Sequence, residues 1–472
     1  MDKRKIISFI PIFISFISFL FLSIYVNRID LFPSEYIYLF YALEAFIYTS
    51  CIILILFKNK IMKIISISFA ILFIIINCIG IYYLKHLDKF IDNGFTGDII
   101  TTSTYYLVTS KNNTVNDIDS VTLDNEITYF EISKNNSIAR DKLGNYEYIV
   151  TDNINKYLLD NKNNSFYLLV DSINYKITFE YDNNLKEEDY KIIYEFDIET
   201  SEKRNNTVKD SYTILVMGKD FSRNRNDLNM LITVNTITHK VLFTSIPRDY
   251  YIPTVGYKYP DSLMVMGILG DDVVIESLEA FFGIEIDFKI SLYTENLVDI
   301  VDKIGGIEYC SDKAYRTTHA LVIGTYDDTK GSKFYVKKGC QHLNGIQTLT
   351  VARERLAFKG ENGGDRVRQN NCRKIMISIL EKILKDTKIT NYTSVLDSFS
   401  DFYITDMNRD TITVLLKSVI RNGGYEILEQ SVNGSGGHGP LRQNTCVSDL
   451  LYPYMDTVKK ASEKINEIVN ER

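Results

Sequence analysis

Three long apolar runs near the amino terminus constrain the fold of this chain most strongly. They cover residues 6–26, 37–57 and 64–84, and each is close to the roughly 20 residues that an α-helix needs to cross a bilayer. The first run lacks the small-residue cleavage pattern of a signal peptide around residues 23–27, and two further runs follow it. The sequence therefore predicts three transmembrane helices within residues 1–84.

Basic residues around these runs predict their orientation. They gather before the first run and between the second and third, whereas Arg28 is the basic residue between the first and second. The gathered residues are Lys3, Arg4, Lys5, Lys58, Lys60 and Lys63. Because cytoplasmic loops carry an excess of Lys and Arg, we expect a cell-membrane protein with a cytoplasmic amino terminus and an extracellular carboxyl-terminal part. Glu44 lies inside the second run, and we interpret it as a packing residue.

The rest of the chain predicts two α/β domains. Its 472 residues, of which 45% are hydrophobic, are enough for cores outside the membrane. Residues 85–204 alternate short β-like runs with Asn- and Asp-rich turns, which predicts a small accessory domain that ends in a linker over residues 199–210. The β-like runs cover residues 105–108, 166–170, 176–180 and 190–196. Residues 205–472 form the second predicted domain, a mixed central sheet flanked by helices.

Charge and cysteine spacing exclude two classes of function. The net charge of −7 leaves no basic face that could displace the counterions of a nucleic acid, so no nucleic-acid partner is expected. No two cysteines form a C-x-x-C pair, so a zinc site has no support. Four of the six cysteines fall in the predicted external part, and we predict the disulfides Cys310–Cys340 and Cys372–Cys446.

The stretch from residue 212 to 250 carries the charges around which the second domain is organised. Apolar, β-branched runs at 213–217, 230–234 and 240–245 predict buried strands. Charged residues stand at their ends; they are Lys219, Asp220, Arg223, Arg225, Asp227, Arg248 and Asp249. Ligands of α/β proteins usually bind beyond the ends of the strands. Carboxylate oxygens are suitable ligands for magnesium, and arginine side chains bind phosphate oxygens through two N–H groups. The pattern predicts a site for a metal-bound phosphate, with a solvated surface loop as the alternative.

Apolar residues recur at helical spacing further along the chain. The predicted helices cover residues 272–282, 294–304, 345–355, 367–385 and 410–420, and the predicted strands cover 289–293 and 425–430. Arg353 and Arg355 cannot share one helical face, so both reach one ligand only if the helix ends there. Asp365 and Arg368 stand near a helix start, whose amides favour phosphate. The alternative for these arginines is a set of solvated ion pairs with acids such as Glu354.

Four motifs follow one another through this region: GKDFSRNRND, SIPRDYY, HLNGIQTLTVARERLAF and GGDRVRQNN. They resemble, in the same order, the G-x-D, R-x-D, S-I-P-R-D, L-N-G-x-x-A-L-x-x-x-R-x-R and G-D-x-x-R motifs of the LytR-CpsA-Psr family, over residues 212–385. The resemblance implies an enzyme that transfers a glycopolymer, such as a teichoic acid or capsule, from a polyprenyl-pyrophosphate carrier onto peptidoglycan. It also implies a hydrophobic tunnel between the core helices for the membrane lipid.

The charges and the resemblance together give one hypothesis for the site. The residues expected to bind the pyrophosphate are Arg225, Arg248, Asp249, Arg353, Arg355, Asp365 and Arg368. Asp220 and Asp227 are expected to hold Mg²⁺. The residues expected to act in catalysis are Asp227, Arg248, Arg353 and Arg355. Either Asp227 or Asp249 could accept the proton of the attacking sugar hydroxyl, and the sequence leaves this open.

Two features depart from the family pattern. The loop between Asp220 and Asp227 is short, which we expect to narrow the substrate pocket. Asn371 and Cys372 stand where the family continues with Arg-Gln, so the polar contact that this Arg-Gln pair would make is not expected in this chain. His438 lies in a Gly-rich loop, where we expect an exposed side chain rather than a catalytic one.

Two alternatives compete with the transferase. In a pyrophosphatase, water would attack in the same site and release polyprenyl phosphate. A membrane-anchored regulator or receptor would bind polyprenyl phosphates without turnover. The short segments expected in the cytoplasm contain no DNA-binding motif, which disfavours the regulator.

Overall fold

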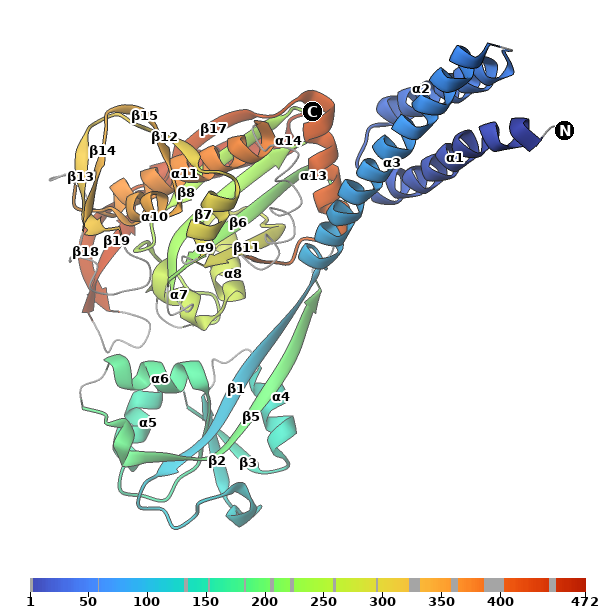
Figure 1. Cartoon of the computed structure of the whole chain (residues 1–472). Coiled ribbons are helices and arrows are strands. Elements are labelled where there is room, and N and C mark those ends of the chain that lie inside the picture. Colours follow the sequence, from blue (N-terminus) through green and yellow to red (C-terminus); the bar gives the residue numbers. More distant parts are fainter. Residues whose placement is uncertain are drawn as a thin grey trace.

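A computed structural model describes most of the chain, and its elements form three parts: an amino-terminal helical bundle, a small domain and a larger domain (Figure 1). The residues that the structure does not describe are 1–2, 58, 131–134, 152, 182–183, 204–207, 221–224, 258–259, 294–295, 322–331, 358–363, 386–402 and 441–446. The sheets and helices confirm the predicted α/β fold class, preceded by three apolar helices.

Three helices form the amino-terminal bundle. They are α1 (Lys3–Ile29), α2 (Ser34–Leu56) and α3 (Lys60–Gly94). By length and composition, all three could cross a membrane. The helix α3 ends at Gly94 rather than at the predicted residue 84, because Leu87 and Ile91 are buried against the larger domain. Glu44 is 4% exposed inside the bundle, which agrees with a packing role.

The small domain is a five-stranded sheet with short helices packed against it. The strand order is β3-β2-β4-β1-β5, and the long strands β1 and β5 are antiparallel. The strands are β1 (Asp98–Ser110), β2 (Glu126–Phe130), β3 (Glu147–Thr151), β4 (Leu168–Asp171) and β5 (Tyr190–Lys203). The helices are α4 (Asn136–Leu143), α5 (Ile154–Asn161) and α6 (Ser172–Tyr181).

Two predictions for the small domain are wrong. Residues 176–180, predicted as β-like, lie in α6, because the carboxylate of Asp171 accepts the N–H of Asn174 at 2.8 Å and starts a helix directly after β4. Residues 199–203 of the predicted linker belong to β5, where they pair with β1. The connection between the two domains is therefore shorter than predicted.

The larger domain is built on a six-stranded mixed sheet, which confirms the predicted mixed central sheet. Its order is β16-β11-β6-β7-β8-β17. The strands are β6 (Ser211–Lys219), β7 (Asn226–Asn235), β8 (Lys240–Ile246), β11 (Phe288–Tyr293), β16 (Tyr403–Thr405) and β17 (Glu426–Ser431). Neighbours β6, β7 and β8 are antiparallel, whereas β11 is parallel to β6 and β17 is parallel to β8.

Helices cover both faces of this sheet. Because alternate residues of a strand point to opposite faces, Leu215 and Met217 pack on one side while Ile214 and Val216 pack on the other. The helices on the first side are α7 (Leu263–Leu269), α8 (Asp271–Phe282) and α14 (Met455–Asn470). Those on the second side are α11 (Asp365–Lys385) and α13 (Arg409–Asn422).

A separate layer of strands and helices packs against α11 on the face away from the sheet (Figure 1). It contains α9 (Asn296–Lys303), β12 (Ile307–Ser311), β13 (Tyr315–Ala320), β14 (Lys333–Val336), β15 (Gly339–Leu343) and α10 (Gly345–Arg353). The remaining strands are β9 (Tyr251–Ile252), β10 (Asp261–Ser262), β18 (Gly434–Pro440) and β19 (Val447–Pro453). Gly345 is required here, because an added Cβ would lie 2.2 Å from the carbonyl oxygen of Val298 on α9.

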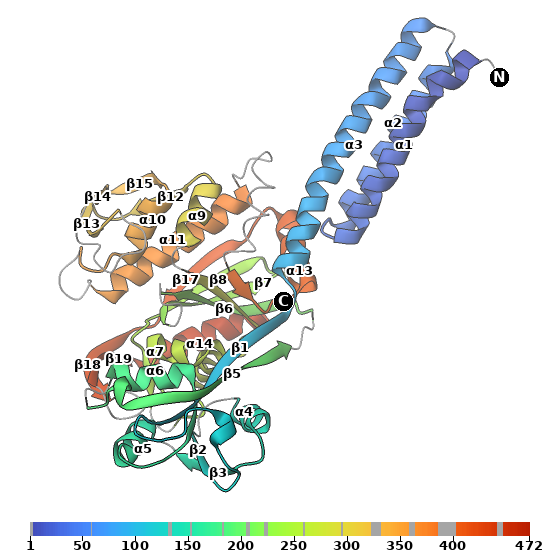
Figure 2. The same ribbon diagram turned by 60° about the horizontal axis from the view of Figure 1, so that its bottom comes forward.

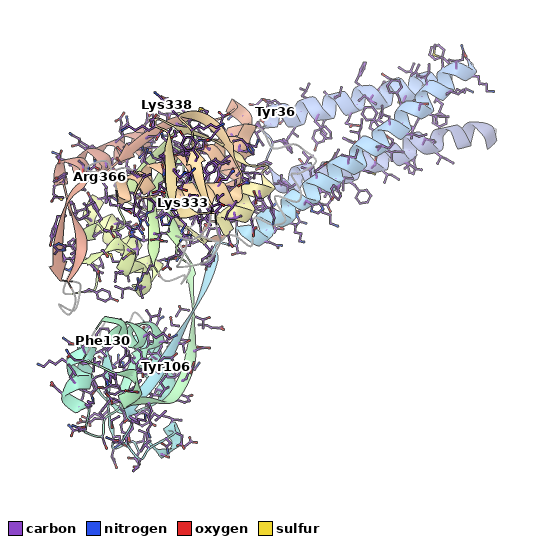
Figure 3. The ribbon with its side chains drawn as sticks, turned by 60° about the vertical axis from the view of Figure 1, so that its left-hand side comes forward. Tyr36, Tyr106, Phe130, Lys333, Lys338 and Arg366 are labelled. Atoms are coloured by element: carbon purple, nitrogen blue, oxygen red, sulfur yellow. A yellow bond between two sulfur atoms is a disulfide. The ribbon has the colours of Figure 1, made fainter. Side chains whose placement is uncertain are left out.

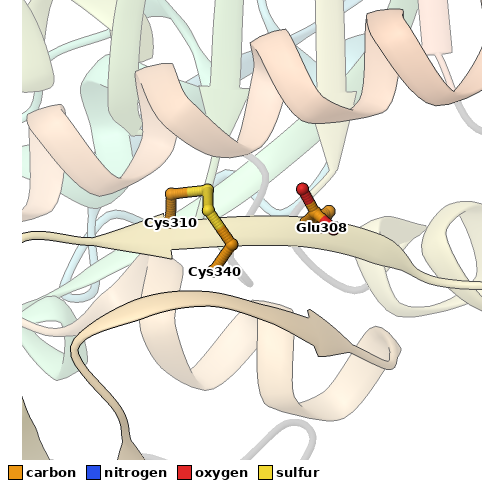
Figure 4. A group of neighbouring side chains, drawn as sticks. All are labelled: Glu308, Cys310 and Cys340. Atoms are coloured by element: carbon orange, nitrogen blue, oxygen red, sulfur yellow. A yellow bond between two sulfur atoms is a disulfide. The ribbon is translucent and has the colours of Figure 1, made fainter.

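One of the two predicted disulfides forms. Cys310 on β12 and Cys340 on β15 are directly opposite each other in the register and are joined through their sulfur atoms (Figure 4). Cys372 carries a free thiol, so its predicted pairing with Cys446 is wrong; Cys446 itself lies outside the described residues. Cys372 instead donates from its thiol to the carbonyl of Ala352 at 3.4 Å.

The helix α13 joins the larger domain to the end of the bundle where α1 and α3 finish and α2 begins (Figure 2). Arg409 donates to Asp88 at 2.8 Å and also pairs with Asp92, and both acids belong to α3. Apolar residues of α13 pack beside these ion pairs, against Leu87 and Ile91. Further pairs join Lys417 to Asp30 and Arg421 to Glu35, each at 2.9 Å.

We expect the Cys310–Cys340 disulfide to stabilise the outer layer. The two cysteines are separated by 30 positions in sequence, and their link limits the conformations that the unfolded chain can adopt. Loss of such a disulfide lowers the free energy of unfolding by about 2–4 kcal/mol. The Cys310→Ser/Cys340→Ser protein should therefore melt at a lower temperature than the wild type in differential scanning fluorimetry. Equal melting temperatures, with the disulfide verified in the wild type by mass spectrometry, would contradict this expectation.

Candidate active site

Three strand ends meet at one edge of the central sheet. Lys219 at the end of β6 is opposite Asn226 at the start of β7, and Asn229 on β7 is opposite Ile246 at the end of β8. Residues that follow β6, begin β7 and follow β8 therefore lie side by side. This register explains why Asp227 and Arg248 are neighbours although 21 positions separate them in sequence.

Asp227 is bound by two arginines from different elements. Its Oδ1 accepts from Nη1 of Arg248, which follows β8, and from Nη1 of Arg368 on α11 at 3.2 Å. Arg368 also pairs with Asp365 at the start of α11. The Nε of Arg248 lies 3.4 Å from Asp249 and 3.7 Å from Asp365. The two guanidinium groups and three carboxylates form one network.

The end of α10 brings two further arginines to the same place. The helix stops at Arg353, and Glu354 has an extended conformation, so Arg353 and Arg355 both line the cavity described below. The carboxylate of Glu354 points elsewhere: it is fully buried and accepts the N–H of Thr318 at 2.5 Å and the N–H of Leu356 at 2.8 Å. The alternative of a solvated ion pair is therefore wrong for Glu354, whose contacts fix the turn between the arginines.

These charges line a cavity of about 410 Å³. Seven predicted residues line it: Asp220, Arg225, Asp227, Arg248, Arg353, Arg355 and Arg368. The rest of the wall is largely apolar and consists of Leu228, Met264, Leu292, Leu297, Ile300, Leu349, Ala352, Ile375 and Met376, with Gly218 and Cys372. A pocket with an apolar wall and a few convergent charges suits a ligand that has a greasy part and an anionic part.

The sequence predictions for the site differ from the structure in detail. Asp249 and Asp365 are not among the lining residues and reach the site through Arg248. Tyr293 and His319 line the cavity but were not predicted, because a lone histidine before a loop gives no sequence signal. His319 lies on β13, which packs against α10, so its position depends on contacts between separate elements.

The departures from the family pattern have structural explanations. Asn371 accepts from the hydroxyl of Tyr309 at 2.7 Å and donates to the carbonyl of Val351 at 3.0 Å, so it fixes α11 against its neighbours. Cys372 lines the cavity, and burial raises the pKa of its thiol to about 12. The loop expected to narrow the pocket includes residues 221–224, which lie outside the described residues, so that expectation stays a prediction. His438 is exposed, as expected.

The acids of the network have opposite electrostatic environments. Burial disfavours the charge of Asp227, but Arg368 and Arg248 outweigh burial and lower the pKa of its carboxyl. Burial raises the pKa of Asp249; Arg248 opposes the rise and the carboxylate of Asp365 adds to it. Burial and the neighbouring guanidinium groups lower the pKa of Arg355. Asp227 therefore holds a charge firmly, whereas Asp249 takes up a proton more readily.

We expect Asp227 to make stability depend on pH. Because folding lowers the pKa of its carboxyl, the stabilisation is complete above the ordinary value of about 3.9 and is lost as pH falls through the lowered value. Asp227→Asn should lower stability at pH 7 by only about 1 kcal/mol, since the side chain is 37% exposed and water screens its charge. Melting temperatures measured as pH falls below about 3.9 should decrease less steeply for this variant than for the wild type. Parallel curves for the two proteins would refute the assignment.

Comparison with known proteins identifies relatives of this chain. A sequence model of the LytR_cpsA_psr family matches residues 168–464. A Bacillus cereus (strain AH820) protein named polyisoprenyl-teichoic acid–peptidoglycan teichoic acid transferase TagU is 29% identical over 210 residues, which are 44% of this chain and 64% of the relative. This chain thus spans slightly less than two thirds of that relative. An uncharacterized Staphylococcus aureus protein is 30% identical over 207 residues, 43% of this chain and 48% of the relative.

Solved structures of similar proteins cover a little more than half of the chain. Bacillus subtilis TagV is 20% identical with a TM-score of 0.46, covering 56% of this chain and 100% of that one. TagT bound to LI-WTA is 18% identical with a TM-score of 0.43, covering 55% of this chain and 91% of that one. The family match covers more than half of the 472 residues and begins within the small domain. The chain belongs to the LytR-CpsA-Psr family.

Proposed function

We propose that this protein is a membrane-anchored phosphotransferase that moves a glycopolymer from a polyprenyl-pyrophosphate carrier onto a sugar hydroxyl of peptidoglycan. The observation that carries the proposal is the single cavity in which five arginines and two aspartates adjoin an apolar wall. A pyrophosphate would bind the arginines, and the polyprenyl tail would lie along the apolar wall. The TagU relatives, named as teichoic acid transferases, support this type of reaction.

The charges would act on the phosphoryl group that is transferred. The acceptor hydroxyl oxygen forms a bond to the phosphorus that carries the glycopolymer, and the bond from that phosphorus to the bridging oxygen breaks. Polyprenyl phosphate leaves with the bridging oxygen. Arg248, Arg353 and Arg355 neutralise negative charge on the phosphoryl oxygens and on the leaving group, which is how most phosphoryl transfer is catalysed.

A magnesium ion fits the donor chemistry of the site. Asp220 and Asp227 both line the cavity, and carboxylate oxygens are the ligands that Mg²⁺ prefers. Asp227 has a second carboxylate oxygen besides the one that Arg248 and Arg368 bind. When bound by these two carboxylates, the ion would supply additional positive charge to the phosphate oxygens.

Asp249 is the better candidate for the proton acceptor. A general base must be able to take up a proton, and burial raises the pKa of Asp249 while two arginines keep Asp227 charged. Asp249 does not itself line the cavity but lies beside Arg248, which does, so the proton would reach Asp249 through one bridging water. Asp227 would then serve to hold Arg248 and Arg368 in position.

The membrane part supports an external site. The orientation that places the amino terminus in the cytoplasm puts the ends of α1 and α3 that contact α13 on the outer side. The disulfide between Cys310 and Cys340 fits this side, because disulfides persist in oxidising compartments. The donor lipid, the apolar wall and the peptidoglycan acceptor would then be on the same side of the membrane.

Substitution of Arg248 or Arg355 should strongly reduce transfer. In the full-length protein in lipid nanodiscs, Arg248→Ala and Arg355→Ala should each reduce transfer by about 100- to 1000-fold, because each loses a charge that stabilises the transition state. The matched control is Arg316→Ala, an exposed arginine on β13 that does not line the cavity. The measurement is phosphodiester-linked polymer on peptidoglycan after incubation with the lipid-linked donor. Unimpaired transfer by the Arg248 and Arg355 variants would overturn the proposal.

The same assay separates the two alternatives. A pyrophosphatase releases polyprenyl phosphate while leaving no polymer on the peptidoglycan. A regulator binds the lipid-linked donor but forms neither product, with or without Mg²⁺.

The pH dependence of transfer should report on Asp249. Folding raises the pKa of this carboxyl above its ordinary value of about 3.9. As pH falls through the raised pKa, Asp249 becomes protonated and can no longer act as a base, so the transfer rate should fall. Asp249→Asn should lower the rate by about 100-fold or more and remove this acidic limb. Asp227→Asn should keep the limb. An acidic limb that survives in Asp249→Asn would assign the proton to another group.

A further inference from the structure

A second cavity, of about 320 Å³, opens on another face of α11. Arg366, Asn370 and Lys374 line it at intervals of four residues, which places them along one stripe of the helix. Arg368 and Cys372 line the first cavity from a different stripe of the same helix. The two cavities therefore flank the amino-terminal half of α11, and a helix with its side chains is only about 10–12 Å across.

The second cavity is lined mainly by cationic and hydrogen-bonding groups. Three cations, Lys313, Arg366 and Lys374, face one acid, Asp312. Lys374 lies 3.0 Å from Asp312 and lowers the pKa of that carboxyl, so the acid stays ionised and the charged lining side chains sum to +2. This local excess contrasts with the net charge of −7 of the whole chain. An anionic group would be attracted to this point of an otherwise acidic protein.

The frame of this cavity is fixed by bonds on several sides. Lys374 donates to the carbonyl of Cys310 at 3.3 Å, and the disulfide joins Cys310 on β12 to Cys340 on β15. The floor includes Tyr309, which is 2% exposed and donates to Asn371 on α11. Arg366, labelled in Figure 3, donates to the carbonyl of Gly434 at 3.2 Å and ties α11 to the β18–β19 hairpin. The cations are thus mounted on elements that are held together.

We propose that this cavity binds a phosphodiester group of the glycopolymer whose pyrophosphate end occupies the first cavity. This inference rests on the proposed function. The guanidinium fork of Arg366, the two ammonium groups and the amide N–H groups of Asn370 suit phosphate oxygens. A polymer chain that leaves the first cavity needs to pass only one helix to reach the second. The enzyme would thereby select donors whose glycan itself carries phosphate.

Binding of a soluble phosphodiester tests the cavity directly. The probe is oligo(glycerol phosphate) with the full-length protein in nanodiscs, and the variant is Lys313→Gln/Lys374→Gln. We expect binding about 10-fold weaker than to the wild type, since two charge-assisted contacts are lost. Lys313→Arg/Lys374→Arg, which keeps both charges, should bind as the wild type does. Because Lys374 also holds Cys310, the exposed Lys313→Glu variant provides a second test and should weaken binding several-fold while melting as the wild type does.

Transfer assays then test the selection of donors. One donor is a lipid pyrophosphate that carries a neutral disaccharide, and the other carries a glycerol phosphate polymer. Lys313→Gln/Lys374→Gln should raise KM about 10-fold for the phosphate polymer and leave transfer of the neutral disaccharide unchanged. Equal losses with both donors, or probe binding that the variants do not weaken, would overturn the inference. Wild-type protein that binds the probe but transfers neither donor would refute the proposed function and leave the second site standing.

A competing ligand for the cavity is a carboxylate of the peptidoglycan peptide. Muramyl dipeptide, used as the probe in the same binding experiment, should bind no more weakly to the Lys313→Gln/Lys374→Gln variant than to the wild type. If muramyl dipeptide binds the wild type more tightly than oligo(glycerol phosphate) and the variant loses that binding, the cavity is an acceptor site and the phosphodiester assignment is wrong.

Discussion

The carboxylate of Asp227 holds together two of the arginines that line the cavity, Arg248 and Arg368. Several guanidinium groups around one pocket repel one another; burial lowers the pKa of Arg355 most, and the charges of Arg248 and Arg368 lower it further. Asp227 offsets this repulsion by accepting from both Arg248 and Arg368, which come from different elements of the domain. A buried cation without such a partner would be costly. The arrangement keeps Arg248 and Arg368 together at one cavity.

Backbone geometry determines which side chains take part. The antiparallel register of β6, β7 and β8 brings three strand ends together at one edge of the sheet. The helix α10 ends at Arg353, and Arg355 therefore also reaches the cavity. Glu354 maintains that turn from behind by accepting backbone N–H groups. Two arginines separated by one residue can serve one ligand only with such an interruption of the helix.

Much of the fold was predictable because its strands and helices have clear periodicity. The runs at 213–217, 230–234 and 240–245 all lie within strands. Of the charged residues predicted at their ends, Asp220, Arg225, Asp227 and Arg248 line the cavity. Residues 176–180 were mispredicted because a β-branched run fits a strand or a helix, and the cap at Asp171 decides between them. His319, like the free thiol of Cys372, depends on contacts between distant segments, which periodicity does not report.

The attachment of α13 to the helical bundle has a geometric consequence. Ion pairs from Arg409, Lys417 and Arg421, together with the apolar packing around Leu87, join the larger domain directly to the ends of the helices. A domain on a long flexible tether would sample many heights above the lipid surface. Here these contacts fix the larger domain against the helical bundle, so its distance from those helices is set by the folded protein rather than by the length of a linker.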